Sequence, residues 1–220
     1  VDGFLLSKDK KVLKAFPPAK ANTYYTLLPP TIEEIGAQAF YYVQELENVT
    51  IPENVTKIDK FAFDRTAKLN TIAFLGQTPI TNVDPSANVN THDIQISIRK
   101  NAQPAFASNA FWNNFKQLGV SFFEEVNGTG NGETEFFPLS QNAVMIVDTK
   151  ADVFTYVVPK TVKNSTDNHV YEIRLWGDYA LKDSPATSKF EEVVFKNQLD
   201  YMGLNAFDKA DGSSFVKRIF

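Results

Sequence analysis

The sequence predicts a β-rich solenoid: a right-handed stack of parallel strands with short helical return segments and flanking β-hairpins. Three observations support this prediction. The stretch 28–50 is repeated by the stretch 51–73 at a constant spacing. Each copy joins a strand-like segment to a proline and an irregular apolar segment, and a second pair of copies with a longer spacing occupies the C-terminal part. Such periods are typical of proteins in which each unit buries its apolar face only against the next unit.

The first pair of copies keeps six apolar positions in register. Leu28, Ile32, Ile35, Phe40, Leu46 and Val49 recur 23 residues later as Ile51, Val55, Ile58, Phe63, Leu69 and Ile72. Twenty-three residues are too few for a helix pair or a propeller blade and fall in the range of leucine-rich repeats. We therefore expect these side chains to form a core rather than a site.

Each copy contains one strand and one return segment. Apolar and polar residues alternate up to Ile51, as in a half-buried strand, and Pro52 ends it because proline cannot donate to the ladder. The apolar residues from Val55 to Phe63 then follow at mixed spacings, which indicates a short helical or irregular return.

The flanking segments are expected to have other structures. Asp2 to Pro17 has two apolar runs around the polar turn Lys8 to Lys11, which predicts a β-hairpin. The segment Gly76 to Asp93 is rich in Pro, Asn, Thr and Asp, and we expect a long loop that leaves the repeat track. Ile94 to Ile98 alternates like a strand, and Ala102 to Phe115 predicts one or two short helices that cover an open end of the stack.

The C-terminal part repeats this plan with a period of 26. Ile173, Trp176, Leu181, Phe190 and Val193 recur as Leu199, Met202, Phe207, Val216 and Ile219. We place the three extra residues in the loops 182–189 and 208–214. Three glycines and no apolar residue make 127–132 the most linker-like stretch. The predicted domains are a hairpin with repeats (1–75), a loop, strand and capping helices (76–126), a linker (127–132), and a second hairpin with repeats (133–220).

Composition excludes several classes of protein. The 220 residues are 43% hydrophobic and 22% charged, as in an ordinary soluble protein, and no run reaches the ~20 apolar residues of a membrane-spanning helix. The net charge of −4 and the scattered Lys and Arg disfavour binding to nucleic acid. Cysteine is absent, so no disulfide or thiolate site exists.

No catalytic constellation is evident. The two histidines, His92 and His169, are far apart and lack a second ligand at metal spacing. Glu33-Glu34, Glu124-Glu125 and Glu191-Glu192 are adjacent pairs, whose side chains point to opposite faces of a strand. The glycines of 128–132 lack the Lys-Ser/Thr of a phosphate loop. We therefore expect no enzyme, no cofactor and no metal site.

The repeats resemble those of the BspA-like leucine-rich-repeat family. Thr31 to Phe40 with Leu46 to Pro52 is one copy, Val55 to Phe63 begins a second, and Trp176 to Leu181 and Met202 to Phe207 are looser ones; Asp2 to Pro17 resembles the hairpin often found beside such repeats. The likeness covers about two-thirds of the chain and departs from the family's frequent Cys or Asn at Val43, Thr66, Ser184 and Ala210.

The resemblance implies a secreted or cell-surface bacterial protein that takes part in adhesion. Its expected partner is a protein on a host or neighbouring cell, or a glycan, and no nucleic acid. A carbohydrate-binding module for glycan uptake is the alternative, in which Tyr41, Tyr42 or Trp112 stacks on sugar rings in a planar row of exposed aromatics. A spacer role in a longer surface protein is a further alternative.

The candidate binding residues lie at two places in the first repeats. The strands should present outward-facing polar side chains, and two tyrosines follow Phe40 where the second copy has Asp64 and Arg65. Tyrosine is favoured at interfaces because it combines a large contact area with a polar tip. Contact of these tyrosines with the neighbouring hairpin is the competing explanation. The predicted partner-binding residues are Tyr41, Tyr42, Asn48, Thr50, Asn70 and Thr71.

Overall fold

The computed structural model describes the chain as two compact units, Val1–Val120 and Ser121–Phe220. Within them, the structure describes residues 3–21, 24–89, 94–126, 133–150, 153–178, 180–182, 191–208, 214 and 216–220, without the side chains of residues 117, 118 and 133. The predicted linker 127–132 lies outside the described residues. Each unit is considered by itself.

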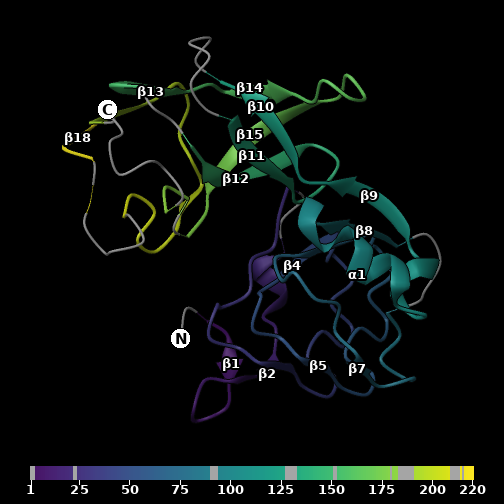
Figure 1. Cartoon of the computed structure of the whole chain (residues 1–220). Coiled ribbons are helices and arrows are strands. Elements are labelled where there is room, and N and C mark those ends of the chain that lie inside the picture. Colours follow the sequence, from purple (N-terminus) through teal and green to yellow (C-terminus); the bar gives the residue numbers. More distant parts are fainter. Residues whose placement is uncertain are drawn as a thin grey trace. The chain divides into compact units, whose positions relative to one another are not determined.

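The first unit contains a sheet that begins with a hairpin and continues through the repeats. β1 and β2 pair antiparallel, which confirms the predicted hairpin, and every later pair is parallel. Figure 1 shows β1, β2, β5 and β7 following one another along this sheet. Its strands, in spatial order, are β1 (Leu5–Leu6), β2 (Val12–Ala15), β3 (Glu34–Ile35), β5 (Lys57–Ile58) and β7 (Asn82–Val83).

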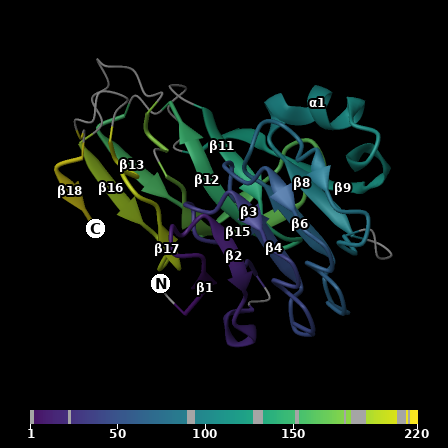
Figure 2. The same ribbon diagram turned by 90° about the horizontal axis from the view of Figure 1, so that it is seen from below.

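A second sheet of the first unit is entirely parallel. Figure 2 shows its strands side by side: β4 (Asn48–Ile51), β6 (Thr71–Phe74), β8 (Gln95–Ile98) and β9 (Lys116–Val120). Asn48 pairs with Thr71 and Glu34 pairs with Lys57, so both sheets advance by 23 residues between these repeats. This parallel stack confirms the predicted solenoid.

The segment 76–93 does not leave the repeat track, so that expectation was wrong. Its strand β7 pairs in parallel with β5, and the N–H of Phe63 donates to the carbonyl of Ala87. Two paired residues suffice for a strand of this sheet, and the polar, proline-rich remainder suits the turns on either side. The repeat therefore continues through residues that lack its apolar signature.

The helices of the first unit are short. They are η1 (Pro18–Lys20), η2 (Lys100–Ala102), α1 (Gln103–Ser108) and η3 (Trp112–Asn114), and the last three confirm the helices predicted within 102–115. The rings of Phe106 and Trp112 contact Phe74, at centroid distances of 5.4 and 4.8 Å. These helices thus extend the apolar core beyond the regular repeats.

Aromatic side chains stack along the core of the first unit. The ring centroids of Phe16 and Phe40 are 5.0 Å apart, and those of Phe40 and Phe63 are 4.8 Å apart with planes only 9° from parallel. These spacings match the roughly 4.8 Å between neighbouring strands. One phenylalanine per turn therefore stacks on the next as a direct result of the repeat.

The second unit has a mixed sheet and a parallel sheet. The mixed sheet contains β10 (Phe122–Glu125), β11 (Glu133–Pro138), β12 (Ala143–Thr149), β15 (Val170–Trp176) and β14 (Thr161–Lys163), with β17 (Tyr201–Met202) also paired to β15. The parallel sheet contains β13 (Thr155–Val158), β16 (Glu192–Phe195) and β18 (Arg218–Ile219). Trp176 pairs with Met202 and Val193 with Ile219, which confirms the 26-residue period.

The core of the second unit is built around Trp176. Its ring contacts Tyr156, Phe195 and Phe207 at centroid distances of 5.4 to 5.8 Å, and its Nε1 donates to the carbonyl of Ala206 at 3.0 Å. A buried hydroxyl chain lies beside it: the Thr134 hydroxyl is 2.5 Å from that of Tyr156 and 2.8 Å from that of Thr149. The predicted loop insertions, 182–189 and 208–214, lie almost wholly outside the described residues.

Candidate binding surface

Three of the predicted binding residues are buried. Asn48 and Thr50 in β4 and Thr71 in β6 are almost completely inaccessible, and only Asn70, just before β6, is exposed. The expectation that these strands present an open polar face was therefore wrong. Alternation assigns side chains to two faces of a sheet, but it does not determine whether either face meets water. In β4 and β6 every residue is buried, as is common in parallel sheets.

The two tyrosines, by contrast, are exposed. Tyr41 is 41% and Tyr42 is 55% accessible, and their ring centroids lie 6.3 Å apart with planes tilted by 36°. This exposure argues against burial beneath the neighbouring hairpin. The rings stand on the return segment that leads from β3 to β4, so they belong to the edge of the stack and not to a sheet.

Backbone hydrogen bonds between consecutive return segments position these side chains. The N–H groups of Gln38, Phe40 and Tyr42 donate to the carbonyls of Lys60, Ala62 and Asp64, at 3.1, 2.8 and 3.0 Å. Alternate N–H groups thus join the two repeats as in a ladder, while Phe40 remains in the core. The outward side chains of the second return are thereby brought next to the two tyrosines.

The return segments use a left-handed backbone at repeated positions. Gln38 and Phe61 have φ of 60° and 55°, and Tyr42, Arg65 and Asn88 have φ of 61°, 61° and 56°. Within each set the positions are 23 residues apart. Left-handed backbone is unfavourable for residues other than glycine, and asparagine tolerates it better than tyrosine, phenylalanine or arginine. This spacing of exposed residues is a signal that the sequence analysis missed.

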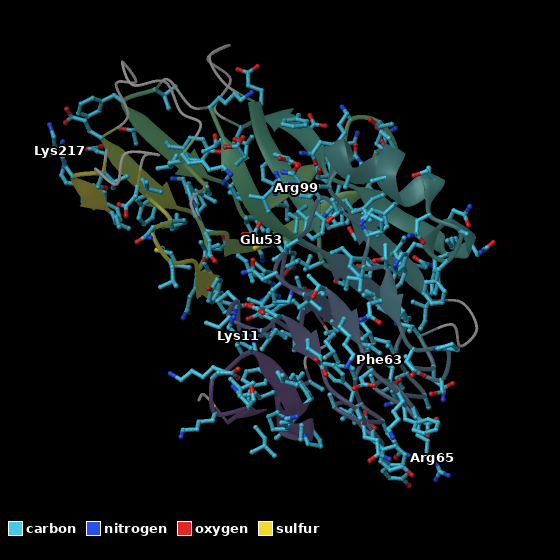
Figure 3. The ribbon with its side chains drawn as sticks, turned by 60° about the horizontal axis from the view of Figure 1, so that its bottom comes forward. Lys11, Glu53, Phe63, Arg65, Arg99 and Lys217 are labelled. Atoms are coloured by element: carbon cyan, nitrogen blue, oxygen red, sulfur yellow. The ribbon has the colours of Figure 1, made fainter. Side chains whose placement is uncertain are left out.

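An arginine completes the exposed group. The guanidinium carbon of Arg65 lies 5.7 Å from the centroid of the Tyr41 ring, within the range of a cation–π contact, and Phe61 is 40% accessible. Figure 3 shows Arg65 at the outer margin of the first unit, whereas Phe63, two residues earlier, lies among the packed side chains. We refer to Tyr41, Tyr42, Phe61 and Arg65 as the tyrosine–arginine patch.

The carboxylates of this edge hold turns together. Asp59 accepts from the backbone N–H of Lys60 and from Lys57, at 2.8 and 3.1 Å, and these bonds, the first above all, lower the pKa of Asp59. The hydroxyl and N–H of Ser86 lower the pKa of Asp84 in the same way. These carboxylates are therefore charged at neutral pH and occupied by local donors.

Comparison with known proteins identifies the repeats. A model of the BspA type leucine rich repeat region matches residues 15–131 in six copies. The chain belongs to this family. Searches of curated proteins and of solved structures gave no match. The 26-residue copies of the second unit lie beyond the matched residues, although they stack in the same manner.

The glycine of the BspA-type motif has a clear structural role here. A Cβ atom at Gly36 would lie 2.7 Å from the carbonyl oxygen of Leu13, and one at Gly177 would lie 2.9 Å from that of Ile146. Real Cβ atoms do not approach carbonyl oxygens so closely, and the N–H of each glycine donates to that same oxygen. Glycine therefore permits the close approach of one BspA-type repeat to the preceding strand.

The predicted acidic pairs mostly join BspA-type repeats to their neighbours. Glu33 pairs with Lys11, Glu34 with Lys57, Glu191 with Lys217 and Glu192 with Arg218. Figure 3 shows Lys11 on the hairpin and Lys217 beside β18. Glu124 instead accepts from the N–H of Ser165 at 2.5 Å. The pairs thus link separate segments of the chain.

The remaining candidates have structural contacts. His169 lies 2.7 Å from the Gln141 carbonyl and packs edge-on against Tyr171, while His92 lies outside the described residues. Trp112 is buried and donates to the Ile80 carbonyl at 2.6 Å, so its predicted role in sugar stacking was wrong. In the part of the chain that is described, no helix has the length and apolar character needed to span a membrane.

Proposed function

We propose that this chain is a non-enzymatic leucine-rich-repeat module, secreted or displayed on a bacterial cell surface, that binds a protein on a host or neighbouring cell. The observation that carries the proposal is the exposed tyrosine–arginine patch. Tyrosine and arginine are the residue types enriched, together with tryptophan, in the residues that contribute most to protein interfaces. Four such side chains gathered on stacked return segments offer a preformed contact surface.

A protein partner fits the patch better than a flat sugar does. The rings of Tyr41 and Tyr42 are tilted by 36° and do not form a plane, and Trp112 is withdrawn into the core. The uneven surface matches side chains that insert between the rings. The patch also joins an apolar area to a cation, as interface residues that combine burial with polar contacts do.

The test is capture of surface proteins by the immobilised chain. Surface extracts of host cells and of neighbouring bacteria are passed over the wild-type chain, over Tyr41→Ala/Tyr42→Ala, and over the control Phe154→Ala, which removes an exposed aromatic from the second unit. We expect a captured protein whose affinity falls at least about tenfold in the double variant and is unchanged in the control.

Two results would contradict the proposal. Equal capture by the wild-type chain and the double variant would show that the patch does not bind the partner. Saturable binding of one sugar class on a glycan array, lost in the double variant, would identify the chain as a carbohydrate-binding module instead.

A further inference from the structure

We infer that the tyrosine–arginine patch, together with Lys60, binds an acidic segment of the partner in which carboxylates stand next to apolar side chains. The inference rests on the proposed function and adds the chemistry of the bound segment. Its evidence is the state of the charged groups on this edge and the conformation of the backbone that carries them.

Arg65 is a cation held in place without an anion. Its guanidinium lies over the Tyr41 ring and, among the described residues, forms no ion pair. Lys57 and Lys68, in the same repeat, do have partners: Lys57 bonds Glu34 and Asp59, and Lys68 bonds Glu45 at 2.5 Å. A stacked guanidinium keeps the donors on its rim available, and their planar fork matches a carboxylate.

The neighbouring carboxylates are already occupied. Asp59 and Asp84 accept from local donors in their turns, and Asp64 accepts from the Asn88 side-chain amide at 2.7 Å. All three are only partly exposed, whereas Lys60 and Arg65 are exposed. The charge that this edge presents to solvent is therefore cationic, although the whole chain carries a net charge of −4.

The backbone indicates that the outward side chains have a role of their own. At one left-handed position the third repeat has Asn88, a residue type that tolerates this conformation, whereas the first two repeats have Tyr42 and Arg65. Phe61 occupies the other left-handed position of the second repeat. Strained conformations persist preferentially at functional sites, and here the strained residues supply three of the four side chains of the patch.

The occupant must therefore offer both anions and apolar groups. Carboxylates of the segment would bond the Arg65 fork and the Lys60 ammonium, and apolar side chains next to them would cover Tyr42 and Phe61. An extended segment meets this need because its side chains alternate in direction, so that neighbouring acidic and apolar residues reach adjacent points of the edge.

The test is a selection of peptides by the folded chain. A phage library of random twelve-residue peptides is selected on the immobilised wild-type chain, and selected peptides are titrated by fluorescence anisotropy against four variants. Arg65→Gln removes the cation, and Arg65→Lys keeps the charge but loses the fork. Tyr41→Ala/Tyr42→Ala removes the rings. Lys8→Gln, in the hairpin turn, is the control that removes the same unit of charge elsewhere.

We expect Asp and Glu to be enriched at least twofold over the unselected library, next to apolar residues. The affinity of such peptides should fall about tenfold or more in Arg65→Gln, because charge-assisted hydrogen bonds are lost. It should fall less in Arg65→Lys and not at all in Lys8→Gln. Replacing the acidic residues of one peptide by their amides should have the same effect as Arg65→Gln.

Selected peptides that depend on the tyrosines but lack acidic residues, or bind Arg65→Gln unchanged, would overturn this inference and leave the proposed function standing. A selection in which no peptide depends on the tyrosines would overturn this inference, and the capture experiment would then decide the proposed function separately. Self-association of the chain that is lost in Arg65→Gln would identify a second copy as the occupant and would also overturn it.

Discussion

The two units stack repeats in the same way but fill their cores differently. In the first unit Phe40 and Phe63 occupy the same place in successive turns and stack face to face, at 4.8 Å. In the second unit a single residue, Trp176, lies at the centre and its neighbours meet it mostly edge-on. The comparison indicates that a short constant period lets one side chain stack on its own copy, whereas a longer period leaves a space that one large residue fills.

Polar groups also differ between the two cores. The second unit buries the hydroxyl chain Thr149, Thr134 and Tyr156, while the cluster of buried side chains around Phe40 and Phe63 is aliphatic and aromatic. Both units share the ion pairs that join one repeat to the next, such as Lys68 with Glu45 and Lys217 with Glu191. Exposed pairs of this kind contribute little stability, so the cores distinguish the units.

The largest expected effect concerns the stacked phenylalanines. Phe63→Ala should lower the free energy of unfolding of the first unit by about 3 to 5 kcal/mol, because it opens a cavity between Phe40 and the next turn. Urea unfolding followed by circular dichroism measures this change, with Phe154→Ala as an exposed control. A loss below about 1 kcal/mol would mean that the ladder does not contribute as one core.

The two tryptophans allow a matched comparison, since each unit contains one. Trp176→Phe should cost about 2 to 3 kcal/mol, because it removes buried volume and the hydrogen bond to the Ala206 carbonyl. Trp112→Phe should cost a similar amount, since Trp112 is equally buried and donates to the Ile80 carbonyl. Each single-tryptophan variant also reports, by fluorescence, the unfolding of the unit that keeps its tryptophan. A Trp176 effect well below that of Trp112 would refute a central role for Trp176.

The buried hydroxyl chain should make the second unit sensitive to base. Burial raises the pKa of Tyr156 from 10.0 to about 12, so the folded unit holds the phenol proton more tightly than the unfolded chain does. This contribution to stability is complete below pH 10 and is lost as the pH rises toward 12.

Tyr156→Phe should remove this pH dependence and cost about 1 to 2 kcal/mol at neutral pH, because the Thr134 hydroxyl loses a partner. Unfolding by urea at several pH values between 8 and 11.5 tests both parts. An unchanged slope of stability against pH in the variant would assign the base sensitivity to other groups.

The smallest effect concerns the exposed edge of the first unit. Tyr42→Gly should change the free energy of unfolding by no more than about 1 kcal/mol in either direction, because relief of the left-handed backbone offsets the flexibility of glycine. Thermal unfolding measures this change. A larger loss would show that the Tyr42 ring supports the fold, whereas a small change with lost binding would separate the patch from the core.

Much of the fold was predictable because it depends on local pattern. The 23- and 26-residue spacings, the hairpin before the repeats and the apolar residues that face inward all follow from side-chain periodicity, which a solenoid preserves from one turn to the next. The exposure of Tyr41 and Tyr42 was also predictable, because they are additions to a repeat whose apolar positions were already filled.

The tertiary structure alone decided which polar and aromatic residues meet solvent. Thr50 alternates like an exposed strand residue but is buried, and Trp112 is a plausible sugar platform but is enclosed. Exposure depends on what covers a face, and that covering comes from residues distant in sequence. Arg65 reaches Tyr41 for the same reason: the two are 24 residues apart, and only the hydrogen-bonded stacking of two return segments brings the guanidinium over the ring.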